Sequence, residues 1–184
     1  LVQQTSPDQK GLAFLLFAIA YLSSAAIVAR RRGTSTAAFP HFMVAAGILL
    51  GCAIIAEMED FWIPILLGAE AICFMILGAR IREQIVQRTG ELMIGAAFVA
   101  LLATRGAFAY VPLSAYVPFW NERALAFAVL AGACAVAGRF RRVSAGGPLA
   151  SLATYGWVMT LVILAMVEIN DIFLARAAGS AGLD

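Results

Sequence analysis

Residues 61–79 read FWIPILLGAEAICFMILGA, and Glu70 is the one charged side chain among them. A helix that crosses a membrane needs about 20 consecutive, mostly apolar residues, and this stretch is close to that length. Its apolar residues occur on every side of a helix rather than along one stripe, so the stretch predicts a helix surrounded by lipid. Arg80 and Arg82 follow it directly, as expected where a helix leaves the membrane.

The rest of the chain repeats this pattern. Of the 184 residues, 62% are hydrophobic and 13% are charged, whereas soluble domains average roughly 45–50% and 25%. A water-soluble fold could not bury so much apolar surface, so the composition indicates a bilayer. Membrane strands alternate in units of about 10 residues, and the apolar runs here are longer and unbroken. The runs that qualify or nearly qualify as spanning helices are 11–29, 37–56, 61–79, 91–109, 124–138 and 148–169.

Charged residues in the connections predict the topology. Arginines occur in alternate connections, at 30–32, 80–88 and 139–142, and acidic residues mark the opposite helix ends, at 57–60, 122 and 168–171. The positive-inside rule places the arginine turns in the cytoplasm and both termini outside. Glu168 and Asp171 are then expected at the outer interface. The hairpins resemble one another, which either internal duplication or the usual interfacial preference of aromatic and acidic residues would explain.

The predicted fold is therefore all-α. It is a polytopic transmembrane helical bundle over 11–171, with six helices arranged as three hairpins. Residues 1–10 are polar and form an exposed lead-in, and 172–184 form a C-terminal tail.

Ionisable residues inside a membrane span are costly, and two stand out in the predicted spans. Glu70 lies about 12 Å into its helix at 1.5 Å per residue, and Arg105 lies near the outer end of the next helix, at a similar depth. We predict a buried ion pair between them that holds the two helices together. The alternatives are a proton or substrate relay, a protonated Glu70, or an Arg105 side chain that reaches up to the interface.

The sequence offers little for cofactor chemistry. One histidine cannot form a bis-histidine haem site, and the position of the only lysine, Lys10, outside the predicted helices excludes a retinal-type Schiff base. Each of the three cysteines lies in an apolar run, and no zinc, nucleotide-binding or hydrolase motif occurs. No basic stripe suits nucleic acid. We therefore predict no metal, no cofactor and no nucleic-acid partner.

The sequence of 61–142 resembles a bacterial family of predicted polytopic membrane proteins, domain of unknown function 2339. Trp62 with LGAEA at 67–71, LGARIR at 77–82, LLATR at 101–105 and, most specifically, NERALAF at 121–127 carry the resemblance. It implies many helices, a bacterial envelope setting and a chain shorter than other members. The motif positions that it marks are Glu70, Arg105, Asn121, Glu122 and Arg123.

We expect a non-catalytic structural or assembly subunit of a bacterial envelope complex, because no catalytic set can be assembled. It would lie in the inner membrane with both termini periplasmic. Its partners would be the lipid bilayer with other membrane subunits, or further helices of a longer chain. Two alternatives stay open: a transporter or channel component that uses Glu70 and Arg105, and an envelope enzyme that acts on lipid or polysaccharide through acidic residues on the outer face.

Overall fold

The computed structural model describes residues 10–33, 36–104, 107–108, 117–141 and 148–181. In these ranges the chain forms six helices and no strand: α1 (Lys10–Arg32), α2 (Ala38–Glu57), α3 (Trp62–Ile81), α4 (Gln84–Ala103), α5 (Glu122–Arg141) and α6 (Pro148–Ala181). Each helix is long and apolar enough to cross a membrane. The predicted all-α fold is confirmed, and the chain is a multi-pass membrane protein.

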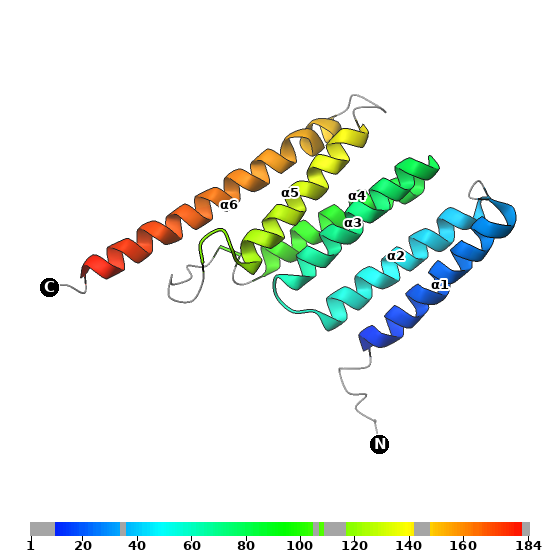
Figure 1. Cartoon of the computed structure of the whole chain (residues 1–184), viewed down its shortest axis with the longest axis horizontal. Helices are drawn as coiled ribbons and strands as arrows, with labels where there is room; N and C mark the ends of the chain where they lie inside the picture. Colours follow the sequence, from blue (N-terminus) through cyan, green and yellow to red (C-terminus); the bar gives the residue numbers. More distant parts are fainter. Residues whose placement is uncertain (1–9, 34–35, 105–106, 109–116, 142–147, 182–184) are drawn as a thin grey trace, which may run out of the picture.

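Neighbouring helices pair as antiparallel hairpins (Figure 1). The closest packing joins α1 to α2, α3 to α4 and α5 to α6, which confirms the predicted arrangement. Helix α3 also packs on α5, and α2 contacts both α3 and α4. The hairpins thus form a row in which α1 and α6 occupy the two ends (Figure 1).

Helix α4 differs from its predicted range of 91–109, because it starts at Gln84 and ends at Ala103. Arg82 adopts a left-handed conformation with φ 58°, and the Glu83 N–H donates to the Gly78 carbonyl at 2.9 Å. This cap ends α3 and turns the chain within two residues. Hydropathy placed the start too late because the first turns of α4 are polar.

Helix α6 was expected to end at 169 and instead continues to Ala181. The polar residues Asn170 and Asp171 follow this predicted end directly. Asp171 is only 1% exposed and forms an ion pair with α5, so it does not end the helix. Most of the residues predicted as a C-terminal tail are helical.

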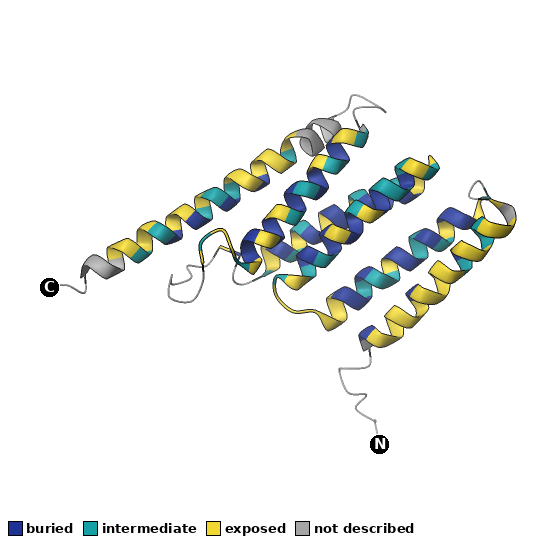
Figure 2. Ribbon diagram, in the orientation of Figure 1, coloured by how far each residue is buried: buried dark blue, intermediate teal, exposed yellow. Residues whose placement is uncertain are grey.

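Large apolar side chains cover the outside of the molecule, the reverse of a soluble protein. Leu16 of α1, Leu92 of α4 and Met166 of α6 are 60%, 76% and 67% exposed. The buried positions face neighbouring helices and include many alanines and glycines (Figure 2). Small residues let helix backbones approach closely in lipid. Gly47 and Gly51 of α2, for instance, face Phe74 and Leu67 of α3.

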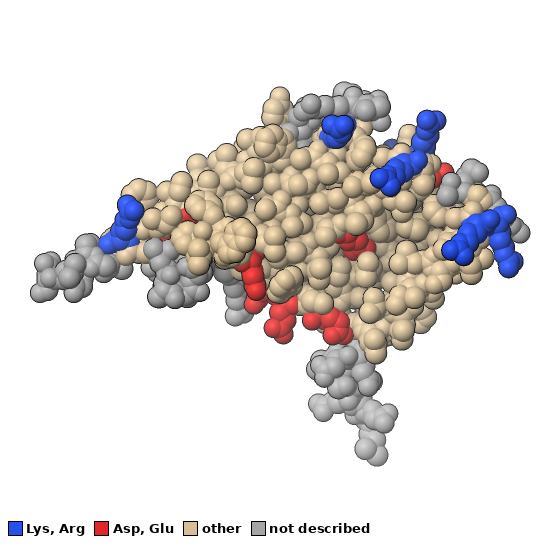
Figure 3. All heavy atoms as spheres, in the orientation of Figure 1, with Lys and Arg blue, Asp and Glu red and all other residues tan. Residues whose placement is uncertain are grey.

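Most of the exposed charges separate along the helix axes (Figure 3), with the exception of Arg176, which is exposed near the C-terminal end of α6. Exposed Arg30, Arg80 and Arg139 lie at the helix ends joined by the α1–α2, α3–α4 and α5–α6 connections, and exposed Glu57 and Glu59 lie at the α2–α3 connection. Because consecutive helices alternate in direction, these two sets lie at opposite ends of the bundle. The predicted alternation is present in the structure.

Candidate functional site

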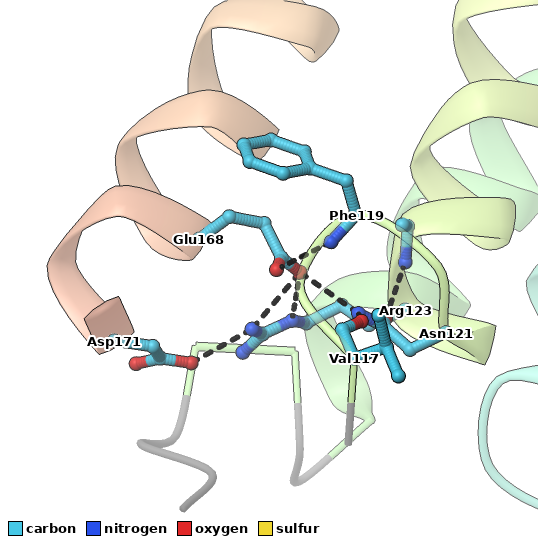
Figure 4. A network of polar contacts seen from close by, with 7 residues as sticks. Val117, Phe119, Asn121, Arg123, Glu168 and Asp171 are labelled. Atoms are coloured by element: carbon cyan, nitrogen blue, oxygen red, sulfur yellow. Dashed lines mark hydrogen bonds and ion pairs between the residues drawn. The ribbon is translucent and has the colours of Figure 1, made fainter. Parts of the chain in front are cut away.

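The most completely built polar cluster joins the start of α5 to α6 (Figure 4). Arg123 forms ion pairs with Glu168 and Asp171, with Nη2 lying 3.0 Å from Glu168 Oε1 and 2.7 Å from Asp171 Oδ2. The Arg123 Nε also donates to Glu168 Oε1 at 3.2 Å. The three residues are 3%, 0% and 1% exposed, respectively. We call Arg123, Glu168 and Asp171 the α5–α6 charge cluster.

A tight turn before α5 completes the cluster. The Trp120 N–H donates to the Val117 carbonyl at 3.1 Å, and Phe119 takes a left-handed φ of 61°. This conformation points the Phe119 N–H at Glu168 Oε2, 3.0 Å away. Both oxygens of Glu168 are therefore bound, one by Arg123 and one by the turn.

Asn121 caps the N-terminus of α5. Its Oδ1 accepts from the Ala124 N–H at 2.8 Å, which is the helix N-cap interaction that asparagine favours. Its Nδ2 donates to the Val117 carbonyl at 3.1 Å and to Glu168 Oε1 at 3.3 Å. The sequence Asn121-Glu122-Arg123 thus places a cap, an exposed acid and a buried cation in successive positions.

The expected position of Glu168 and Asp171 at the outer interface stays a prediction, but within the protein both side chains are buried against Arg123. Glu122 is exposed, so these acids do not share one open surface. The i, i+3 spacing of Glu168 and Asp171, which puts them on one helix face, was the signal that sequence reasoning did not use. A carboxylate saturated by such bonds and shielded from water is suited to holding helices together rather than to proton transfer.

Glu70 is a contrasting case. Its side chain is 7% exposed, and neither carboxylate oxygen has a hydrogen-bond partner among the described residues. Oε2 lies 3.8 Å from the position that a Cβ would take on Gly51 of α2. Arg105 lies outside the described residues, so the predicted Glu70–Arg105 pair stays a prediction.

Histidine and cysteine residues supply no further candidate site in the described part of the chain. No group of histidine, cysteine, aspartate and glutamate there could hold a metal ion. His41 is exposed at the start of α2, and its Nδ1 lies 2.6 Å from the Ala37 carbonyl, which is consistent with an interfacial position. Cys52, Cys73 and Cys134 are free thiols on three different helices.

Comparisons with protein-family models, curated proteins and solved structures find no match to this chain. The resemblance to domain of unknown function 2339 therefore stays a prediction. The fold and the site define a class: a multi-pass helical membrane protein with a buried charge cluster in one hairpin.

Proposed function

We propose that this protein is a non-catalytic structural or assembly subunit of a complex in a bacterial inner membrane. The observation that carries the proposal is the open row of hairpins, in which α1 packs chiefly on α2 and α6 chiefly on α5. Only 11% of the α1 span and 22% of the α6 span is buried within the chain, against 50% for α3. A row with two such ends leaves long helix faces for other membrane helices.

The chemistry of the site supports the same proposal. The hydrogen bonds of the α5–α6 charge cluster join the turn before α5 to helices α5 and α6, and the members of the cluster are almost fully buried. A transport pathway or an enzyme needs polar groups that a substrate can reach. A rigid hairpin, in contrast, suits a subunit that presents a fixed surface to a partner.

Photo-crosslinking in native membranes tests the proposal. A photoreactive amino acid replaces Leu16 on α1 or Met166 on α6, both of which are exposed. A matched control replaces Val99 of α4, which is 67% exposed on a helix in the middle of the row. We expect one end helix to crosslink to a defined membrane protein, recovered in fixed stoichiometry in mild detergent. Adducts with lipid alone at both end helices would contradict the proposal.

We further propose that the arginine-bearing end faces the cytoplasm and that the acidic end and both termini face the periplasm. Support comes from the positive-inside rule and from the exposed arginines at the α1–α2, α3–α4 and α5–α6 connections, against one exposed arginine, Arg176, near the other end. The exposed residues Glu59 and Gln84 lie at opposite ends, so each is replaced with cysteine in a separate variant. An impermeant maleimide should label Glu59→Cys in intact spheroplasts and Gln84→Cys only after lysis. The reversed pattern would refute this orientation.

A further inference from the structure

Two kinds of buried acid occur in this chain. Glu168 and Asp171 are buried with Arg123 as an ionic partner. Glu70 is also more than nine-tenths buried, yet its two oxygens have no hydrogen-bond partner among the described residues. Arg123 thus compensates the charges of Glu168 and Asp171, whereas no described residue is hydrogen-bonded to the Glu70 carboxyl group.

The position of Glu70 makes this lack of partners costly. It lies eight residues after Trp62, which is about 12 Å along α3 and inside the hydrocarbon layer. Leu67 of α3 packs on the same glycine of α2, Gly51, and lies 3.5 Å from the position of its absent Cβ. On α5, Val129 packs against Gly68, and on α4 Gly90 packs against the backbone of Ala71. The part of α3 that carries Glu70 is thus packed closely on α2, α4 and α5.

The helices that pack on α3, namely α2, α4 and α5, carry other titratable groups. The thiols of Cys52 on α2 and Cys134 on α5 and the carboxyl of Glu91 on α4 are the titratable groups away from the helix ends. In the described part of the chain none of them is hydrogen-bonded to Glu70. The remaining titratable or charged residues of these helices lie near their ends: His41 and Glu57 on α2, Arg88 on α4, and Glu122, Arg123, Arg139 and Arg141 on α5.

We propose that Glu70 is a proton-binding site in the membrane interior. Ionised carboxylates are strongly disfavoured in apolar surroundings without a partner, and such a group neutralises itself by binding a proton. The O–H bond of the Glu70 carboxylic acid forms when a proton arrives from water, and it breaks when the proton returns. Oε2 lies against Gly51 of α2, at 3.8 Å from the position of its absent Cβ, which is an ordinary van der Waals distance. The inference goes beyond the proposed subunit role and does not depend on it.

Infrared spectroscopy of the full chain in lipid tests the protonation directly. We expect a C=O band of a buried carboxylic acid at neutral pH, which is lost in Glu70→Gln and unchanged in Glu59→Gln, whose side chain is exposed in the wild type. Transfer to D₂O should shift the band, because a working proton site exchanges with water. A missing band, or a band that never shifts in D₂O, would overturn the proposal.

A hydrophobic carbodiimide gives a second test that needs no variant to fold. The reagent takes the acid proton onto its nitrogen while the carboxyl oxygen bonds to its central carbon, so it modifies protonated carboxyls in apolar surroundings. Mass spectrometry of the wild-type chain should find the adduct on Glu70 and not on Glu59. If Glu70 is instead ionised and paired with Arg105, the adduct will be absent, and Glu70→Gln and Arg105→Gln will each lower the melting temperature. That result would contradict the proton site and leave the crosslinking test of the subunit role untouched.

Discussion

Replacing Arg123 with leucine should lower the free energy of unfolding by about 3–5 kcal/mol, which is the usual cost of removing one partner from a buried ion pair. The substitution would leave Glu168 and Asp171 at 0% and 1% exposure without the guanidinium that lies 3.0 and 2.7 Å from them. Glu168 Oε1 would keep only the Asn121 amide as a donor among the described residues, while the Phe119 N–H would still bind Oε2. Unfolding by a denaturing detergent, followed by circular dichroism, measures the loss.

Two further substitutions show whether charge or geometry matters at this site. Arg123→Lys keeps the positive charge, but one ammonium cannot reproduce the separate Nε and Nη2 donors, so we expect an intermediate loss. Glu122→Gln is the matched control, because this neighbouring acid is exposed and surface charges contribute about 0–1 kcal/mol. A leucine variant at Arg123 as stable as Glu122→Gln would contradict a stabilising role for the cluster.

Replacing all three charged residues of the cluster separates the cost of unpaired carboxylates from the cost of lost packing. When Arg123, Glu168 and Asp171 are all changed to leucine, none of the three charges that form the cluster remains to be paired, and such replacements are often neutral or stabilising. The triple variant should therefore recover most of the stability that Arg123→Leu loses. If it were no more stable than the single variant, the loss would come from packing of the arginine side chain and not from the buried carboxylates.

The helices were predictable because hydropathy alone determines most of them. The run 61–79 has no interruption, and α3 occupies Trp62–Ile81, within two residues of the prediction. Hydropathy does not locate the start of α4, because the first turns of this helix carry Gln84, Gln87 and Arg88. The left-handed backbone conformation of Arg82 ends α3 and lets α4 begin two residues later. Hydropathy does not predict such a conformation.

The site was only partly predictable. Glu70 stood out because it is one charge in a long apolar run, and the structure does bury it. Arg123 was marked by its place in the NERALAF element, but its partners are 45 and 48 residues away in sequence. Hydropathy treats each helix end separately, so Glu168 and Asp171 looked like ordinary interfacial acids. Which way their side chains point depends on how α6 packs on α5.

Close helix packing leads to the second large effect, at Gly90 of α4. A Cβ at this position would lie 2.9 Å from the Ala71 carbonyl oxygen and 3.0 Å from the Met75 N. These are backbone atoms of α3, so Gly90→Ala can be accommodated only if the two helices move apart. Overpacking of this kind costs about 1–3 kcal/mol, and we expect a loss of stability in that range by detergent-induced unfolding.

Gly95 of the same helix provides a control in which the substitution is identical and only the surroundings differ. A Cβ there would meet nothing within 4 Å, and alanine is favoured over glycine in a helix by up to about 1 kcal/mol. Gly95→Ala should therefore leave stability unchanged or raise it, so the two substitutions differ in sign. Equal stabilities of the Gly90→Ala and Gly95→Ala variants would contradict the close approach of α3 and α4 at Gly90. A loss at Gly95→Ala alone would instead place a partner helix on the exposed face of α4.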